Sequence, residues 1–477
     1  MGRTNSFGLE VSKGFVAKML LMLVGFAGTI VFARVLGPAG YGAFHVVVAL
    51  ANVLDNPITG LGVACKKRIS EHGREAGAIL TVGLVGTAII GLVVAGLVLV
   101  VGPHLDYFEI ENGPTFVAVA FLGLIFFKIL QPMVAGTGQF GTAVFLDSAR
   151  SFLTIPLQLI LVLLSWGVAG MVYGLTVASV LTVPLALYVL DVRPAIPTRE
   201  TVRDIWSYAR FSIPSNFIGS AYSKIDILLL GAILGTGASG QYRIAMQLVL
   251  PGATLSMVMG SGLFAEVSSL SSRGEEVAQQ VTNNVAFASI FAIPVFFGAL
   301  AMPESIVVTV FGSEYRDAAI LLVGLAAYQV LQTQATQVSS ALEGLDRPDL
   351  RLYIVAATLA TNVALGLVLV HRIGAVGIVV ATVVAEALKL SSMTYFARRH
   401  VEYEILPTPT RHQFVAAAGM FVVVEFLHRW VGVGSWFELL AVVGIGAVVY
   451  AVSLVAISDL FRHTAKSILA DARKQYR

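Results

Sequence analysis

The sequence contains little charge and almost no cysteine. Charged residues account for 12% of the 477 positions and hydrophobic residues for 57%, whereas soluble domains average about 25% and about 45–50%. Cys65 is the single cysteine, which excludes an internal disulfide and a cysteine-based metal site. This composition predicts an integral membrane protein.

Motifs of enzymatic catalysis are also missing. The sequence has no HExxH metal motif, no Walker phosphate loop and no G-x-S-x-G nucleophile turn, and its eight histidines are scattered. The segments between hydrophobic runs are too short for a nucleotide-binding domain of roughly 100 residues. We therefore expect no catalytic residues, no metal, no cofactor and no nucleic-acid partner, and we predict that the protein is not an enzyme.

Long hydrophobic runs fill most of the chain instead. Since a helix needs about 20 apolar residues to cross a membrane, we expect an all-α polytopic protein with about fourteen spans, at residues 11–35, 40–64, 76–102, 114–135, 141–164, 168–190, 208–233, 241–267, 280–309, 317–341, 352–371, 374–396, 412–431 and 435–457.

Lysine and arginine gather in the connections that follow even-numbered spans. These connections are residues 66–75, 191–204, 271–276, 343–351 and 397–411, and the C-terminal tail is basic as well. The segment 102–113, which follows an odd-numbered span, has neither residue type. The positive-inside rule then predicts a multi-pass protein of the cell (cytoplasmic) membrane with both termini in the cytoplasm.

Two glycine patterns recur about half a chain apart. "RVLGPAGYGAF", Arg34 to Phe44, matches "AILGTGASGQY", Ala232 to Tyr242, at an offset of 198 residues. "WGVAGMVYG" matches "IGAVGIVVA" at an offset of 207 residues, which aligns Gly167 with Gly374. Glycines end helices in any membrane protein, which is the alternative explanation. Since both offsets join a helix to the sixth helix after it, we favour two six-helix lobes in parallel pseudo-twofold repeat.

These repeats predict the division of the chain. We expect an N-terminal lobe over 1–192, a C-terminal lobe over 204–397, two additional helices over 412–457 and a basic cytoplasmic tail over 458–477. We also expect Gly42 and Gly240 to hold equivalent tight turns between the first two helices of each lobe, where a side chain would strain the backbone.

Several segments resemble one transporter family. They are "FARVLGPAGYGAF", "SYARFSIPSNFIGSAYSKIDILLLGAILG" with "GQYRIAMQL", "VFGSEYRDAAILL", "LEGLDRPDLRLY" and "GAVGIVVATVVAE". Together they are similar to the polysaccharide-export, Wzx-type flippases, whose superfamily (MOP) also holds the multidrug extruders (MATE) and the lipid II flippases. The resemblance covers about residues 8 to 400. It implies a V-shaped, two-lobed transporter that moves a polyprenyl-linked oligosaccharide by alternating access, with the head group in a lumen and the isoprenoid tail in membrane lipid. We also expect a glycan polymerase or transferase of the same pathway as a partner.

An anionic head group requires cations at membrane depth, where each charge is costly unless it faces a cavity or a partner. Arg150 lies near the middle of the fifth span, one turn from Asp147. The pair can be an anion site tuned by its own carboxylate, or a self-neutralising pair that packs between helices.

The seventh span carries a polar stripe. Its members recur at spacings of four, three, four and three residues, which places them on one helix face: Ser212, Asn216, Gly219, Ser223 and Asp226. Arg210 and Lys224 lie on a neighbouring face, and Pro214 can bend the helix. The alternative is that the small polar residues hydrogen-bond neighbouring helices. In the family the first helices of both lobes line the lumen, which adds Lys18 and Arg34 by resemblance.

Other polar residues are weaker candidates. Asp55, at a proline-containing break of the second span, can bind a proton or Na⁺ or can cap the kink; Asp147 and Asp226 are the other candidates for ion coupling. Lys128 is expected to reach toward the inner membrane face. Glu386 and Lys389 form an i,i+3 pair with a structural role. Some of the glutamines in the tenth span can face a lumen, namely Gln329, Gln332, Gln334 and Gln337.

Three functions fit these features. The first is a flippase for lipid-linked oligosaccharides, favoured by the count of about fourteen spans and by the cations, since drug extruders of the superfamily generally have twelve. The second is a cation-coupled exporter of small amphiphilic compounds, in which Asp55, Asp147 and Asp226 would be essential. The third, a membrane-embedded glycan polymerase or transferase, would require a large outer loop that the sequence lacks.

Overall fold

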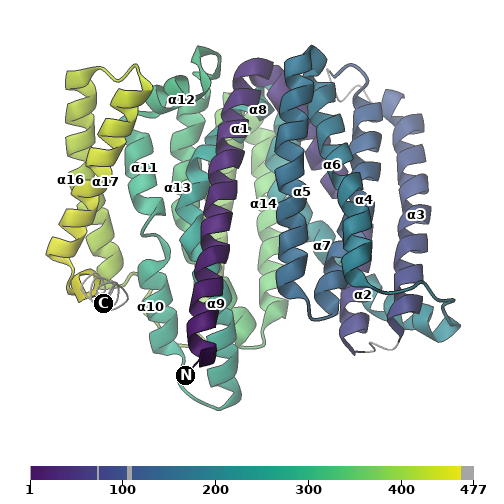
Figure 1. The fold of residues 1–477 in the computed structure, drawn as a ribbon. Coiled ribbons are helices and arrows are strands. Elements are labelled where there is room, and N and C mark those ends of the chain that lie inside the picture. The colour runs from purple at the N-terminus through teal and green to yellow at the C-terminus, as the bar shows by residue number, and fades with distance from the viewer. Residues whose placement is uncertain (1, 72–74, 105–109, 464–477) are drawn as a thin grey trace. The chain divides into compact units, whose positions relative to one another are not determined.

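The computed structural model describes residues 2–71, 75–104 and 110–463, and of residues 2–23, 104 and 348 it describes the backbone alone. The described residues form helices and contain no strand, as Figure 1 shows. Contacts divide the chain into two compact units, Met1–Gly240 and Gln241–Arg477. The all-α prediction is therefore confirmed.

The first unit consists of α1 (Gly2–Leu54), α2 (Asn56–Glu71), α3 (Ala76–Val101), α4 (Gly113–Gly136), α5 (Phe140–Leu161), α6 (Gly167–Leu190) and α7 (Arg199–Leu234). Helix α4 packs against α2, α3 and α6, and α6 packs against α5. Helix α7 packs against α2 and α1, and Arg68 of α2 donates a hydrogen bond to the Asp204 carbonyl of α7 at 3.0 Å. Contacts thus group α7 with the helices that precede it, while the lobe boundary between residues 192 and 204 stays a prediction.

The second unit contains most of α8 (Thr236–Val249), followed by α9 (Thr254–Ser272), α10 (Ala278–Ala288), α11 (Ala292–Ala301), α12 (Pro303–Phe311), α13 (Ala318–Gly344), α14 (Pro348–Ile373), α15 (Ala375–Ala397), α16 (Thr408–Val431) and α17 (Trp436–Ile457). Helix α15 packs against α13 and α14, and α16 packs against α17. Residues 464–477 of the predicted basic tail lie outside the described residues.

Twelve helical stretches within the described residues are long and apolar enough to cross a membrane. One of them, Phe140–Leu190, contains both α5 and α6, which pack against each other after a turn at Ser165 and Gly167. Another, Val24–Leu54, turns at Gly37. The predicted multi-pass architecture is confirmed, with the predicted count of fourteen as an approximation.

The repeated glycine corners have matching backbone conformations. Gly37 has φ 64° and ψ 178°, and Gly235 has φ 83° and ψ 171°. Gly167 has φ 53° and ψ −130°, and Gly374 has φ 62° and ψ −143°. Side chains disfavour these positive φ values. The sequence repeat therefore corresponds to a repeat of local structure.

Gly42 and Gly240 do not form the turns that we expected, because both lie inside helices and the turns are at Gly37 and Gly235. They are instead sites of close backbone approach. A Cβ atom on Gly42 would lie 1.8 Å from the Thr236 carbonyl oxygen, and one on Gly240 would lie 2.1 Å from the Pro38 carbonyl oxygen. The two corners therefore contact each other reciprocally, and this contact explains why glycine occurs at both positions.

Candidate functional site

A buried carboxylate lies at the break between α1 and α2. Asp55 is 2% exposed, and Thr59 donates a hydrogen bond to its Oδ1 at 3.0 Å. The ammonium group of Lys128, from the middle of α4, lies 3.5 Å from Oδ2. Lys128 also donates to Asn52 Oδ1 at 3.3 Å. Lys128 thus pairs with a carboxylate from another helix, and its predicted reach toward the inner membrane face stays a prediction.

Helix α7 adds a second cation to this cluster. Lys224 interacts electrostatically with Asp55, and Ser220 donates to the Asn52 carbonyl at 3.3 Å. Residues from α1, α2, α4 and α7 therefore converge around one carboxylate and two ammonium groups. We call Asn52, Asp55, Thr59, Lys128 and Lys224 the charged cluster. Its two ammonium groups can attract an anion, because a charge at membrane depth is costly unless it faces a cavity or a partner.

Asn52, Thr59 and Ser220, and the partner of Lys128, were not predicted from the sequence. A signal for two of them was present, because Asn52 and Thr59 lie three and four residues from Asp55 and therefore share its helix face. Lys128 gave no comparable signal. Its partner lies far away in the sequence, and only the packing of α4 on α2 brings the two together.

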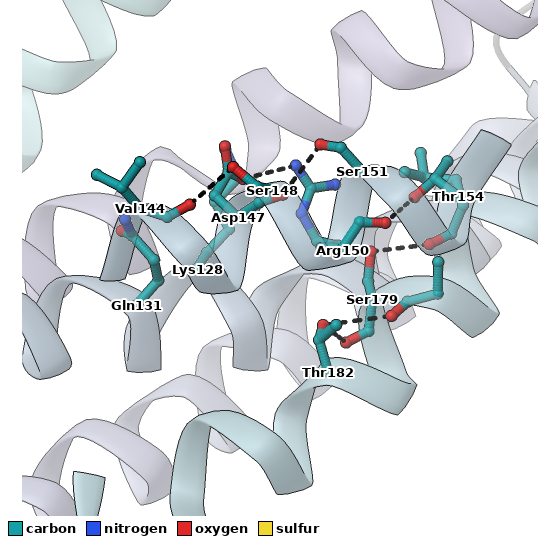
Figure 2. A network of polar contacts seen from close by, with 12 residues as sticks. Lys128, Gln131, Val144, Asp147, Ser148, Arg150, Ser151, Thr154, Ser179 and Thr182 are labelled. Carbon is teal, nitrogen blue, oxygen red and sulfur yellow. Dashed lines mark hydrogen bonds and ion pairs between the residues drawn. The ribbon is translucent and has the colours of Figure 1, made fainter. Parts of the chain in front are cut away.

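The predicted pair on α5 is formed. Arg150 Nη2 donates to Asp147 Oδ1 at 2.9 Å, as Figure 2 shows. The guanidinium carbon lies 5.1 Å from the ring centroid of Phe127 on α4, which favours a cation by its negative face. The Arg150 side chain is 20% exposed and that of Asp147 is 55% exposed. Arg150 is therefore held by an acid and an aromatic ring while its carboxylate partner stays accessible.

The polar stripe of α7 is divided by packing. Ser212 is buried and donates to the Gly60 carbonyl of α2 at 2.7 Å, where a Cβ atom on Gly60 would lie 2.7 Å from Ile213 Cα. Asn216 donates to the Ser212 carbonyl within its own helix at 2.7 Å. Ser223 is exposed, whereas Asp226 is buried. The buried end of the stripe thus joins α7 to α2, and its middle is open.

The remaining candidates are not brought into the charged cluster. Arg210 is exposed, with its guanidinium carbon 4.7 Å from the ring centroid of Phe211. Arg34 is exposed near the Gly37 corner. The side chain of Lys18 lies outside the described part of the chain. The lumen positions of these three residues stay predictions.

Polar residues of the second unit mostly hold helices together. The break between α10 and α11 frees carbonyl groups, and side chains from three other helices bind them: Gln334 donates to the Val285 carbonyl at 3.3 Å, Gln413 to the Ala286 carbonyl at 2.6 Å and Tyr450 to the Ile290 carbonyl at 2.9 Å. Gln337, which is fully buried, donates to Ser256 Oγ at 2.8 Å. These contacts assign Gln334 and Gln337 to packing.

Glu386 and Lys389 form a buried ion pair within α15, with 2.6 Å between Nζ and Oε1. Both partners of this pair belong to one helix. Among the described residues, no group of three or more His, Cys, Asp or Glu side chains could hold a metal ion. The charged cluster of the first unit is accordingly the best candidate for a functional site.

Known proteins resemble this chain along most of its length. It is 26% identical to the probable low-salt glycan biosynthesis flippase Agl15 of Haloferax volcanii, over 92% of this chain and 93% of that protein. It is 24% identical to the probable flippase AglR of the same organism, over 98% of this chain and 97% of that protein.

Solved structures share the fold. The inward closed conformation of the lipid II flippase MurJ matches with a TM-score of 0.79 at 12% identity, over 94% of this chain and 99% of that one. An inward-facing multidrug resistance MATE transporter of the MOP superfamily matches with a TM-score of 0.62 at 18% identity, over 80% of this chain and 95% of that one. The sequence model of one family matches residues 31–320. With this match and the fold that the two structures share, the chain belongs to the family described as polysaccharide biosynthesis protein.

Proposed function

We propose that this protein is a flippase whose substrate is an oligosaccharide linked to a polyprenyl phosphate or diphosphate. It carries this substrate from the cytoplasmic to the outer leaflet by alternating access. The product serves the synthesis of a cell-surface polysaccharide or glycoprotein. The observation that carries the proposal is the likeness over 92% and 98% of the chain to two proteins named as flippases. Their names favour a transporter over an enzyme, and a flippase over an exporter of small amphiphiles.

The charged cluster supplies the chemistry that such a substrate needs. Lys128 and Lys224 both interact with Asp55, so a phosphate that reaches this cluster gains two ammonium partners. Arg150 offers the same phosphate a planar guanidinium group, which can bind two phosphate oxygens at once. Lys18, Arg34 and Arg210, with the hydroxyl of Ser223, extend the proposed path beyond the cluster.

Asp55 is the proposed site of ion coupling. When Lys128 turns from the carboxylate to a phosphate, Asp55 loses its nearest cation while it stays buried. A buried carboxylate without a cation gains a proton or binds Na⁺, because its bare charge is too costly to desolvate. Substrate binding and uptake of H⁺ or Na⁺ are thereby linked. Asp147 and Asp226 are the further candidates.

The proposed topology has both termini in the cytoplasm, because the basic connections follow even-numbered spans. Reporter fusions after Asn112 and after Asp191 test it, since these residues lie in connections of opposite predicted side. We expect opposite locations for the two reporters. The same location for both would overturn the topology. A glycan polymerase or transferase of the pathway is the proposed protein partner on the outer side.

Deletion of the gene tests the flippase proposal. We expect a lipid-linked glycan to accumulate on the cytoplasmic side and the surface glycan to decrease, with both restored by the wild-type gene. The variant Lys128→Gln should restore export poorly at matched protein level. The control variant Arg316→Gln alters an exposed ion pair with Glu304 and should restore it fully. Normal surface glycan without accumulation in the deletion strain would overturn the function.

A further inference from the structure

One exposed face of α15 changes in character along the helix. It consists of exposed residues at spacings of four, four, three, four and three, which share a single helix face: Val380, Val384, Leu388, Ser391, Tyr395 and Arg398. The first three are apolar and the last three are polar, aromatic and cationic. We call this face the α15 stripe. The apolar part lies within a membrane span, and the cationic part lies at its end.

The cationic end of the stripe borders a cavity of about 600 Å³. Its lining includes Arg398, Arg399 and Tyr395, the hydroxyls of Ser391 and Thr394, and apolar residues. The Arg399 guanidinium carbon lies 4.5 Å from the Tyr395 ring centroid, and its Nη2 donates to the Tyr395 hydroxyl. In the part of the chain that the structure describes, neither arginine forms an ion pair.

Two arginines without carboxylate partners, beside hydroxyl groups, are suited to a phosphate. Guanidinium groups bind phosphate oxygens bidentately and are less costly to dehydrate than ammonium groups. Basic pockets at the ends of membrane helices bind the head groups of anionic lipids. The cavity therefore fits a phosphate group that is attached to a membrane lipid.

The apolar end of the stripe borders a second cavity of about 420 Å³, between α11, α13 and α15. Phe296, Ile320 and Val323 line it together with five valines of α15. Gly324 permits the close approach of α13, because a Cβ atom there would lie 2.4 Å from Val379 Cγ1. A groove without polar lining at membrane depth fits a hydrocarbon chain.

The length of the stripe limits which lipid can occupy both cavities. At about 1.5 Å per residue, Val380 and Arg398 are about 27 Å apart along the helix. The hydrocarbon core of a bilayer is about 30 Å thick, so each leaflet supplies about 15 Å. A chain that starts at Arg398 and reaches the groove at Val380 must pass the midplane, which an ordinary acyl chain of one leaflet does not do. A long polyisoprenoid chain is long enough.

We infer that the α15 stripe binds the lipid carrier itself, a polyprenyl phosphate, with its phosphate at Arg398 and Arg399 and its chain in the valine-lined groove. The inference rests on the proposed function, because it names the lipid to which the transported glycan is attached. It assigns the carrier a site on the second unit, apart from the charged cluster of the first unit. Under the proposed topology, the phosphate end lies on the cytoplasmic side, where the glycan is loaded.

Photoaffinity labelling tests this inference on the full chain. The probe is a polyprenyl phosphate with a diazirine in the middle of its chain, added to purified protein in phosphatidylcholine nanodiscs. We expect crosslinks to α11, α13 or α15 around the valine-lined groove. Arg398→Gln or Arg399→Gln should each lower labelling about five-fold, as expected for one interfacial cation. Val384→Trp should lower it by filling the groove. Arg372→Gln is the matched control, because it also removes an arginine, but from the last turn of α14, and Arg372 does not line either cavity.

Competition identifies the ligand. Excess unlabelled polyprenyl phosphate should abolish labelling, whereas phosphatidylglycerol and inorganic phosphate should not. Equal competition by phosphatidylglycerol would show that the stripe binds phospholipids in general. Competition by inorganic phosphate would show that the phosphate alone is recognised and that the groove does not contribute to binding. Either result overturns the inference. So does labelling that is unchanged in both arginine variants. The flippase function is measured separately by glycan export in cells, so a failure of export with intact labelling overturns only the function.

Discussion

Helices α6 and α15 occupy equivalent places in the two repeats but carry different polar residues. The offset of 207 residues that aligns Gly167 with Gly374 also aligns Ser179 and Thr182 with Glu386 and Lys389. All four side chains are buried. The two hydroxyls donate to carbonyl groups of their own helix, whereas the two charged groups pair with each other at 2.6 Å.

This difference shows which kinds of buried polar side chain can replace one another at equivalent positions of the two repeats. Hydroxyls bonded to their own backbone and an i,i+3 ion pair both form within one helix, so the repeats could diverge here and keep the same corners. The Asp55–Lys128 pair of the first unit joins the α1–α2 break to α4. It depends on the relative placement of helices, and it is therefore the pair that a conformational change can make or break.

The largest loss of stability should come from substitutions at the glycine corners, which are the part of the repeat that did not diverge. Gly42→Ala and Gly240→Ala each place a Cβ atom within about 2 Å of a backbone oxygen, which cannot move aside as a side chain can. We expect each to destabilise the protein by more than about 3 kcal/mol, seen as low yield and a lower Tm in detergent. Gly237→Ala is the control, since nothing lies within 4 Å of its Cβ position. Unequal effects of the first two variants would break the equivalence of the corners.

The inter-helix pair should show the next largest effect. Lys128→Met leaves the Asp55 carboxylate buried without its nearest cation, which typically costs about 3–5 kcal/mol. The double variant Asp55→Asn with Lys128→Met removes both charges and should regain most of the stability. It should still fail in glycan export, measured at matched protein level. Full export by the double variant would assign the pair to folding alone.

The intra-helix pair sharpens this comparison. Lys389→Met should destabilise the protein by about 3–5 kcal/mol, whereas Glu386→Gln with Lys389→Met should lie within about 1 kcal/mol of the wild type, because similar shapes replace both charges. Unlike the double variant of the first unit, this one should export glycan normally. Thermal unfolding and the export measurement check both points, and loss of export here would give the Glu386–Lys389 pair a role in transport.

The smallest effect on stability is expected at Arg150. Its partner Asp147 is 55% exposed, so loss of the pair should cost less than about 1 kcal/mol. Arg150→Gln should nevertheless reduce export, and Arg150→Lys should retain part of it, since the charge remains without the bidentate fork. If Arg150 serves only its neighbour, Asp147→Asn with Arg150→Gln will behave like the wild type in export.

Local properties were predictable from the sequence. Hydrophobic runs long enough to span a membrane, the basic connections between them and the glycine corners are each written in a short segment, because hydrophobic length and positive φ are properties of neighbouring residues. The pair Asp147–Arg150 was predictable for the same reason, since its partners are one helical turn apart.

Contacts between distant residues were not predictable. Lys128 and Asn52 are 76 residues apart, and no periodicity links them. The close approach of Gly42 to the second corner and the division of the α7 stripe between packing and open surface also depend on which helices become neighbours. Sequence by itself determined the spans, their corners and the family, because these depend on local chemistry and on length. Only the tertiary structure decided which charges of different helices meet, because the cost of burying a charge in the membrane favours a partner that is near in space, however far away it is in the sequence.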